Sequence, residues 1–140
     1  MQSKLRMFFN SLYDNNTNYC VYYGVYDSDF WGFIHPYMDD RLYEVAIKCN
    51  KNYDKLSQGH GSSYHTTIKQ EILGSYRHHL SQDVLNNGID ECTAVSNIFK
   101  YMGKNVVMFG RSPVTDKGYL RAVAKKCNLE LPNITLVDTK

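Results

Sequence analysis

Two acidic residues at the end of a predicted strand are the first candidates for chemistry in this sequence. Asp27 and Asp29 follow residues 19–26, a run of β-branched and aromatic side chains that predicts a strand buried on both faces. Side chains two positions apart on a strand project from the same face, so the two carboxylates would lie together. Such a pair is stable when a hard cation neutralises it, which favours a Mg²⁺ or Mn²⁺ site. The alternative is a polar turn, for which Asp-Ser-Asp is well suited.

A third acid, Asp116, begins a helix predicted at residues 116–127. It follows a short apolar strand, residues 105–109, and a loop. An acid at this position can also serve only to cap the helix. A metal site therefore requires that Asp116 meets Asp27 and Asp29 at the ends of neighbouring strands.

Five segments of the chain together resemble the DEDD-type 3′–5′ exonucleases, proofreading enzymes with a ribonuclease-H-like fold. The resemblance spans about residues 19–140 and lies in the segments VYDSD (25–29), RLYEVA (41–46), NGIDE (87–91), RSPVTDKGYL (111–120) and LVDT (136–139). The family has D-x-E in the first segment, where this chain has Asp29 in place of Glu. It has His and Asn at the start of the fourth, where this chain has Arg111 and Ser112. The family's general base and fourth Asp are carried on a helix that would lie beyond Lys140.

The resemblance implies that phosphodiester bonds are hydrolysed from a 3′ end with two metal ions. Asp27, Asp29 and Asp116 would hold Mg²⁺ or Mn²⁺, with one ion activating water and the other stabilising the leaving oxygen. Arg111 would contact the scissile phosphate, with Ser112 beside it in the substrate site. Trp31 would stack on a terminal base, the alternative being that it packs against the core or a partner. The expected protein is a small metal-dependent nuclease whose partner is the 3′ end of a nucleic acid.

Two other classes of function stay open. One is a catalytically inactive binding or inhibitor protein that recognises a host partner through exposed Tyr, Trp and Arg side chains. The other is a small-molecule enzyme whose pocket lies between self-associated subunits. Convergence of the three acids would favour the nuclease, and separate positions on the surface would favour the other two classes.

Charge and cysteine content exclude several classes of protein. The 16 Lys and Arg residues balance 14 Asp and Glu to a net charge of +2, which by itself does not indicate a nucleic-acid-binding surface. Four widely spaced cysteines without a C-x-x-C motif indicate neither a zinc finger nor a thioredoxin-like centre. Buried reduced thiols in a cytoplasmic protein are expected, with a disulfide as the alternative. No apolar run is long enough to span a membrane, and the many Tyr, Asn and Lys residues are typical of an AT-rich genome such as a phage's, so host-cell cytoplasm is the expected location.

The elements that must position these residues form one domain, residues 1–140, of mixed α/β class. Residues 1–14 are expected to form an amphipathic helix and residues 19–140 the mixed-sheet core. Hydrophobic periodicity predicts three antiparallel strands, two helices, and then a strand–helix–strand unit with a right-handed parallel crossover, which is the order of a ribonuclease-H-like domain. The strands are expected at residues 19–26, 30–34, 41–49, 105–109 and 134–137, with a loop at 50–63. The helices are expected from Thr66 or Thr67 to Leu80, from Asp90 to Gly103, and over residues 116–127.

Overall fold

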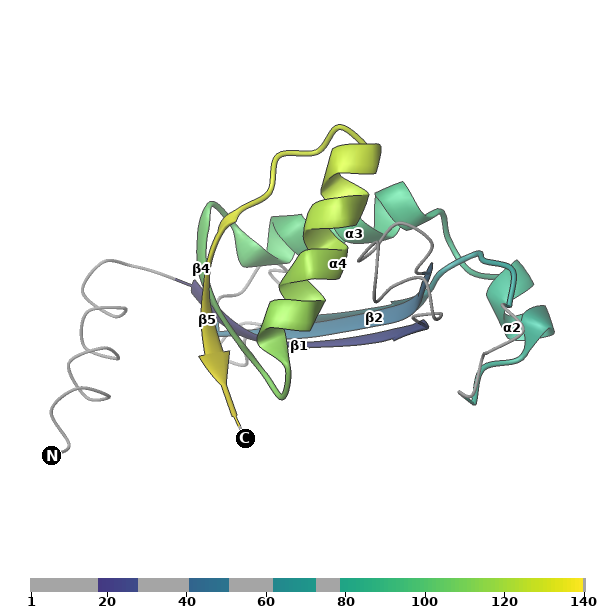
Figure 1. The fold of residues 1–140 in the computed structure, drawn as a ribbon, viewed down its shortest axis with the longest axis horizontal. Helices are drawn as coiled ribbons and strands as arrows, with labels where there is room; N and C mark the ends of the chain where they lie inside the picture. Colours follow the sequence, from purple (N-terminus) through teal and green to yellow (C-terminus); the bar gives the residue numbers. More distant parts are fainter. Residues whose placement is uncertain (1–17, 28–40, 51–61, 73–78, 140) are drawn as a thin grey trace, which may run out of the picture.

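A five-stranded mixed sheet and three helices make up the described part of the chain (Figure 1). The computed structural model describes residues 18–27, 41–50, 62–72 and 79–139. The strands are β1 (Asn18–Asp27), β2 (Arg41–Cys49), β3 (Ser62–Thr67), β4 (Asn105–Gly110) and β5 (Asn133–Asp138), and the helices are α2 (Gln82–Asn86), α3 (Glu91–Met102) and α4 (Pro113–Lys126). The mixed α/β class is therefore confirmed. The helix predicted over residues 1–14 and the strand predicted over 30–34 lie outside the described residues.

Strand β1 lies at the centre of the sheet, whose order is β3-β2-β1-β4-β5. β1 pairs antiparallel with β2, and β2 pairs antiparallel with β3. On the other side, β1 pairs in parallel with β4, and β4 in parallel with β5. Because the chain continues from β1 into β2 on one side and returns as β4 on the other, a topological switch point lies between β1 and β4.

Helices α3 and α4 lie on the same side of the sheet and form the main core with it (Figure 1). Apolar residues recur along α3 at the helical period, so that one stripe faces inward: Ala94, Val95, Ile98 and Met102 are buried. On β1, Cys20 and Tyr22 point into this core, whereas Val21 and Tyr23 are 59% and 57% exposed. The expectation that this stretch of β1 is buried on both faces is therefore wrong, because alternate side chains point to opposite faces and helices α3 and α4 cover one of them.

Helix α3 begins and ends where the sequence predicted. The Asp90 carboxylate accepts a hydrogen bond from the backbone N–H of Thr93 at 3.2 Å, which caps the first turn. The helix stops at Gly103, whose φ of 74° lies in the left-handed region that glycine adopts without a Cβ clash. α4 begins at Pro113 rather than at Asp116, since proline suits the first helical position, where no N–H is needed. Within the described residues, no helix has the length and apolar character to cross a membrane.

Residues 62–67 form strand β3, although the sequence predicted a loop followed by a helix. The predicted helix depended on a four-residue spacing that starts at Ile68 and ends at Leu80. In the structure Ile68 belongs to the main core and forms an isolated parallel bridge with Ile89. Leu80 belongs to a separate cluster beside α2, together with Val25, Tyr43 and Leu85. Residues 73–78 of the predicted helix lie outside the described residues, and Ile68 and Leu80 at its two ends are buried in two different clusters.

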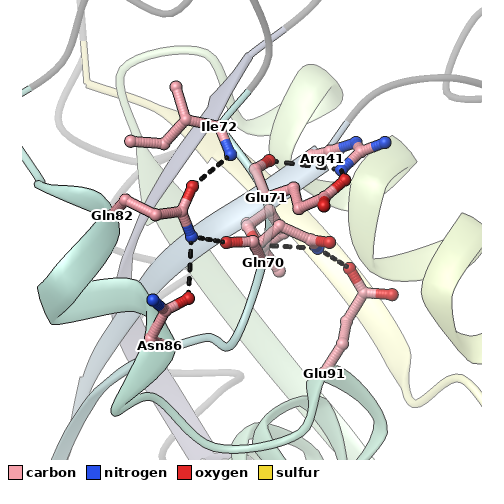
Figure 2. Close-up of polar contacts among 8 residues, drawn as sticks. Arg41, Gln70, Glu71, Ile72, Gln82, Asn86 and Glu91 are labelled. Carbon is pink, nitrogen blue, oxygen red and sulfur yellow. Dashed lines mark hydrogen bonds and ion pairs between the residues drawn. The ribbon is translucent and has the colours of Figure 1, made fainter.

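A polar network holds the segment after β3 in a non-helical conformation (Figure 2). The side-chain amide of Gln82 accepts from the N–H of Ile72 at 3.0 Å and donates to the carbonyl of Gln70 at 2.8 Å. The Gln70 side chain in turn donates to the Glu91 carboxylate at 3.1 Å, and Arg41 donates to a backbone carbonyl of the same segment at 3.2 Å. These side chains satisfy backbone groups that a helix would have satisfied internally, and they anchor the segment to α2 and α3.

Two disulfide bonds join the four cysteines, which corrects the expectation of reduced thiols. Cys20–Cys49 links directly facing residues of β1 and β2, and Cys92–Cys127 links the start of α3 to the end of α4. Strand register and helix packing bring these cysteines together although they are far apart in the sequence. Local sequence patterns therefore do not predict which cysteines pair. Disulfides persist mainly in oxidising compartments, so a cytoplasmic location loses the support that reduced thiols would have given it.

Candidate functional site

A pocket of about 380 Å³ opens at the carboxyl end of β4, next to the switch point of the sheet. β4 ends at Gly110, and the chain turns through Arg111 and Ser112 into α4. The pocket is lined by Val21, Tyr22, Tyr23, Gly24, Tyr26, Phe109, Gly110, Arg111, Ser112, Asp116 and Thr139. The lining residues belong to β1, to the end of β4, to the turn and first residues of α4, and to the position directly after β5. Ligands of open α/β sheets bind at such switch points, outside the carboxyl ends of the strands.

Alternate residues of β1 face the same side of the sheet, and on the side that α4 covers they are Tyr22, Gly24 and Tyr26. Tyr22 is 4% exposed, and its Oη lies 2.9 Å from the position that a Cβ on Gly24 would occupy. The Tyr26 ring stacks on Tyr119 of α4, with ring centroids 4.1 Å apart. The missing side chain at Gly24 therefore leaves room for the Tyr22 phenol, and the stacked tyrosines join β1 to α4.

Asp116 provides the carboxylate of the pocket from the first turn of α4. It is 8% exposed, and its Oδ2 lies 3.4 Å from the position of a Cβ on Gly110. Burial raises the pKa of Asp116 to about 6, because desolvation disfavours the charged form. Burial, followed by the charges of Asp116 and Tyr26, also raises the pKa of Tyr22. At neutral pH the pocket therefore combines a protonated phenol with a carboxylate that is mainly ionised.

The structure brings Arg111 and Ser112, both predicted as substrate-binding residues, into the same pocket as Asp116. Ser112 is the N-cap residue of α4, yet its hydroxyl makes no capping hydrogen bond. Arg111 is exposed and precedes it in the turn. This part of the predicted site is therefore assembled at one place, at the amino-terminal end of a helix.

Asp27 lies further along the sheet. It is the last residue of β1, and its backbone pairs with Arg41 of β2. The last parallel pair between β1 and β4 is Val21 with Phe109, and the six positions from Val21 to Asp27 span about 20 Å of extended strand. Asp116 packs against Gly110, the residue directly after Phe109. The backbone of Asp27 therefore lies several residues further along β1 than the level at which Asp116 contacts β4. Asp29 and Trp31 lie outside the described residues, and the three-acid site stays a prediction.

The described residues do not by themselves fit a two-metal centre. Such a centre needs several carboxylates around two ions about 3.5–4 Å apart. Asp116 is the acid among the residues that line the pocket, and the β1 positions on the same side of the sheet are Tyr22, Gly24 and Tyr26. Among the described side chains of residues 18–26, 41–50, 62–72 and 79–139, no group of three or more His, Cys, Asp or Glu is placed to share a metal ion.

Tyr22, Gly24 and Gly110 are pocket residues that the sequence did not single out. A glycine inside a run of aromatic and β-branched residues was the available signal, because such a glycine marks a place where another group approaches the backbone closely. Tyr22 carried no comparable signal, since the chain contains 12 tyrosines.

The Asp116→Asn variant is expected to be more stable than the wild type at pH 7.5, by about 2 kcal/mol. The pKa of Asp116 is higher in the folded state, about 6, than in the unfolded chain. Between those two pKa values the folded state binds more protons, so the free energy of unfolding of the wild type falls as pH rises. Asn stays neutral and loses this dependence. Urea denaturation from pH 4 to pH 8 in EDTA measures the difference, and wild-type and variant profiles that run parallel would contradict the buried-acid description.

Comparison with known proteins identifies no relative of this chain. The sequence matches no protein-family model, and no curated protein is significantly similar to it.

Proposed function

We propose that the protein is a ribonuclease-H-like relative of the DEDD-type exonucleases that binds the end of a nucleic acid strand without hydrolysing it. The order β3-β2-β1-β4-β5 supports the fold part of this proposal, because two antiparallel pairings followed by two parallel ones are the arrangement of a ribonuclease-H-like sheet. The strand–helix–strand unit of β4, α4 and β5 supports it further.

The turn between β4 and α4 is the observation that carries the binding function. The Arg111 side chain, the Ser112 hydroxyl and the start of the 14-residue helix α4 all border the pocket. A helix start carries partial positive charge, and a guanidinium matches the geometry of a phosphate group. Tyr26 and Phe109 border the same pocket. The Tyr26 ring stacks on Tyr119 and the Phe109 ring packs edge-on against Tyr19, so aromatic side chains lie beside the phosphate-binding turn. A phosphate next to an aromatic ring is the chemistry of a nucleotide.

The β1 side of the pocket favours binding over hydrolysis. In the resembled family, a D-x-E pair on the first strand supplies carboxylates to the metal ions. Here the alternate β1 residues on the Asp116 side of the pocket are Tyr22, Gly24 and Tyr26. A phenol that burial keeps protonated and a glycine bring no negative charge with which to hold a divalent cation.

The Arg111→Ala variant is expected to bind single-stranded oligonucleotides about tenfold more weakly than the wild type, since a charge-assisted contact to phosphate is lost. Fluorescence anisotropy with a 5′-labelled single-stranded DNA oligonucleotide, in EDTA and at fixed salt, measures the affinity. Arg121→Ala is the matched control: it removes the same charge from an exposed position of α4 that does not line the pocket. Equal losses in the two variants would indicate nonspecific charge attraction, and an unchanged affinity in Arg111→Ala would contradict the proposal.

A metal-dependent nuclease is the second candidate, and the buried acid Asp116 at the carboxyl end of β4 is the observation that favours it. Asp27 and Asp29 would then complete the ion site. A thermal-denaturation titration with Mg²⁺ or Mn²⁺ separates the candidates, because a bound ion stabilises the folded state. Stabilisation that disappears in Asp27→Ala, together with shortening of a 5′-labelled oligonucleotide from its 3′ end, would support the nuclease. The binding proposal predicts neither result.

A further inference from the structure

A second pocket, of about 720 Å³, lies at the other edge of the sheet from the candidate site. It opens between the end of α3 and the connection from α4 to β5, beside the residues at which β4 and β5 begin. Because β4 and β5 run in parallel, this edge is opposite to the one at which Arg111 and Asp116 lie. The volume of the pocket suits a small-molecule ligand.

Apolar side chains form two walls of this pocket. Phe99 comes from α3, whereas Leu129, Leu131 and Pro132 come from the connection to β5. Phe99, Leu129 and Leu131 are half-buried and pack against the main core, so part of each side chain is fixed and part borders the pocket. Such walls favour an apolar ligand group, because contact removes both surfaces from water.

Backbone and disulfide contacts hold the two walls in place. Gly103 ends α3 and lines the pocket with backbone alone. The carbonyl of Lys104 accepts a hydrogen bond from the N–H of Asn133 at 2.8 Å, which joins the walls at the start of β5. The Cys92–Cys127 disulfide ties the end of α4 to α3. The pocket is therefore formed before a ligand arrives, which limits the entropy lost on binding.

Two lysines give the α3 wall a positive charge. Lys100 lies in the last turn of α3 and Lys104 just after it, and both side chains are exposed. Neither forms an ion pair with a described residue. The carbonyls at the end of α3 already have another donor, because the Asn18 side-chain amide donates to two of them, at 2.6 and 3.1 Å. Two ammonium groups are therefore available to a ligand anion.

We infer that this pocket binds a small amphipathic acid, a molecule with an apolar chain and one carboxylate. The chain lies against Phe99 and Leu131, and the carboxylate lies between Lys100 and Lys104. Glu130 lines the facing wall and repels a second acidic group there, so a monoacid is favoured over a diacid. The inference is independent of the proposed nucleic-acid binding, since the two pockets lie at opposite edges of the sheet.

Octanoate and octan-1-ol, which share an apolar chain and differ in charge, test the inference by backbone-amide NMR of the isotope-labelled protein. Octanoate is expected to shift the amide signals of Gly103 and Leu131 to saturation, and those of Gly24 and Gly110 at the candidate site much less. The wild type is expected to bind octanoate about tenfold more tightly than octan-1-ol, because the alcohol makes no charge-assisted contact with the lysines.

The double variant Lys100→Gln with Lys104→Gln should bind the two compounds equally. It removes both charges and keeps long side chains that suit a helix. The matched control is Lys69→Gln with Lys125→Gln, which removes two charges from exposed positions that do not line the pocket. The control should keep the preference of the wild type for octanoate.

Three results would overturn the inference: an octanoate titration that leaves the signals of Gly103 and Leu131 unmoved, a double variant that keeps the wild-type preference, or equal losses in the double variant and its control. Arg111→Ala should leave octanoate binding unchanged, since Arg111 lines the other pocket. Loss of octanoate binding in Arg111→Ala would place the acid at the candidate site and would also overturn the inference. Oligonucleotide binding is measured separately, so failure of one proposal leaves the other standing.

Discussion

Reduction of the two disulfides is expected to lower the free energy of unfolding by about 3 kcal/mol for each bond. The bonds close loops with sequence separations of 29 and 35 residues, and each loop restricts the unfolded chain. Cys20–Cys49 holds the register of β1 against β2, and Cys92–Cys127 holds the two helices that cover the sheet. Urea denaturation with and without a dithiol reductant measures the loss.

Paired substitutions separate the contributions of the two bonds. Cys20→Ser with Cys49→Ser removes the bond inside the core, and Cys92→Ser with Cys127→Ser removes the bond between partly exposed residues. The first pair also places two hydroxyls in the core, so it is expected to cost more than the second. Thiols that react with an alkylating reagent in the folded, unreduced protein would contradict the presence of the bonds.

The Gly88→Ala variant is expected to lose about 3 kcal/mol of stability or more, because the added methyl group has no space. A Cβ on Gly88 would lie 2.6 Å from the carbonyl carbon of Ile68, 2.7 Å from the nitrogen of Lys69 and 2.8 Å from the oxygen of Thr67. All three are backbone atoms, so no side-chain rotation relieves the contact. The same backbone is held in place by hydrogen bonds between Thr67, Lys69 and Ile89 at 2.8–3.0 Å.

Asn87→Ala is the matched control for Gly88→Ala. Asn87 is the adjacent, exposed residue, and its side chain makes a hydrogen bond of 2.9 Å to the carbonyl of Asp83. Loss of that surface contact is expected to cost less than about 1 kcal/mol. Thermal or urea denaturation compares the variants, and similar stabilities for the two would show that the chain adjusts around residue 88 without cost.

The acidic residues of this chain lie at two different levels of the sheet. The spacing of Asp27 and Asp29 predicts a site at the end of β1, whereas the pocket brings Asp116 together with Tyr22 and Gly24. Strand β1 extends past the end of its pairing with β4, so the end of β1 and the end of β4 are at different heights in the sheet. Whether the side chains of Asp27 and Asp29 reach this site stays a prediction, because Asp29 and the Asp27 side chain lie outside the described residues.

Elements whose signals are local were predictable from the sequence alone. The strands at β1, β2, β4 and β5 follow from runs of apolar and β-branched residues, and α3 follows from its apolar stripe between Asp90 and Gly103. Arg111, Ser112 and Asp116 were candidates through the resemblance of residues 111–120 to a segment of the exonuclease family, and all three line one pocket of the structure. In each of these cases the deciding interactions lie within a few positions of one another.

Tertiary structure decided the rest. Ser62–Thr67 became a strand because β2 offered an unpaired edge, and Ile68 and Leu80 are buried in separate clusters. The pairing of the four cysteines and the position of Tyr22 and Gly24 beside Asp116 depend on register and helix packing. These contacts join residues distant along the chain, and local periodicity reports which face of an element is apolar but not which other element will cover it.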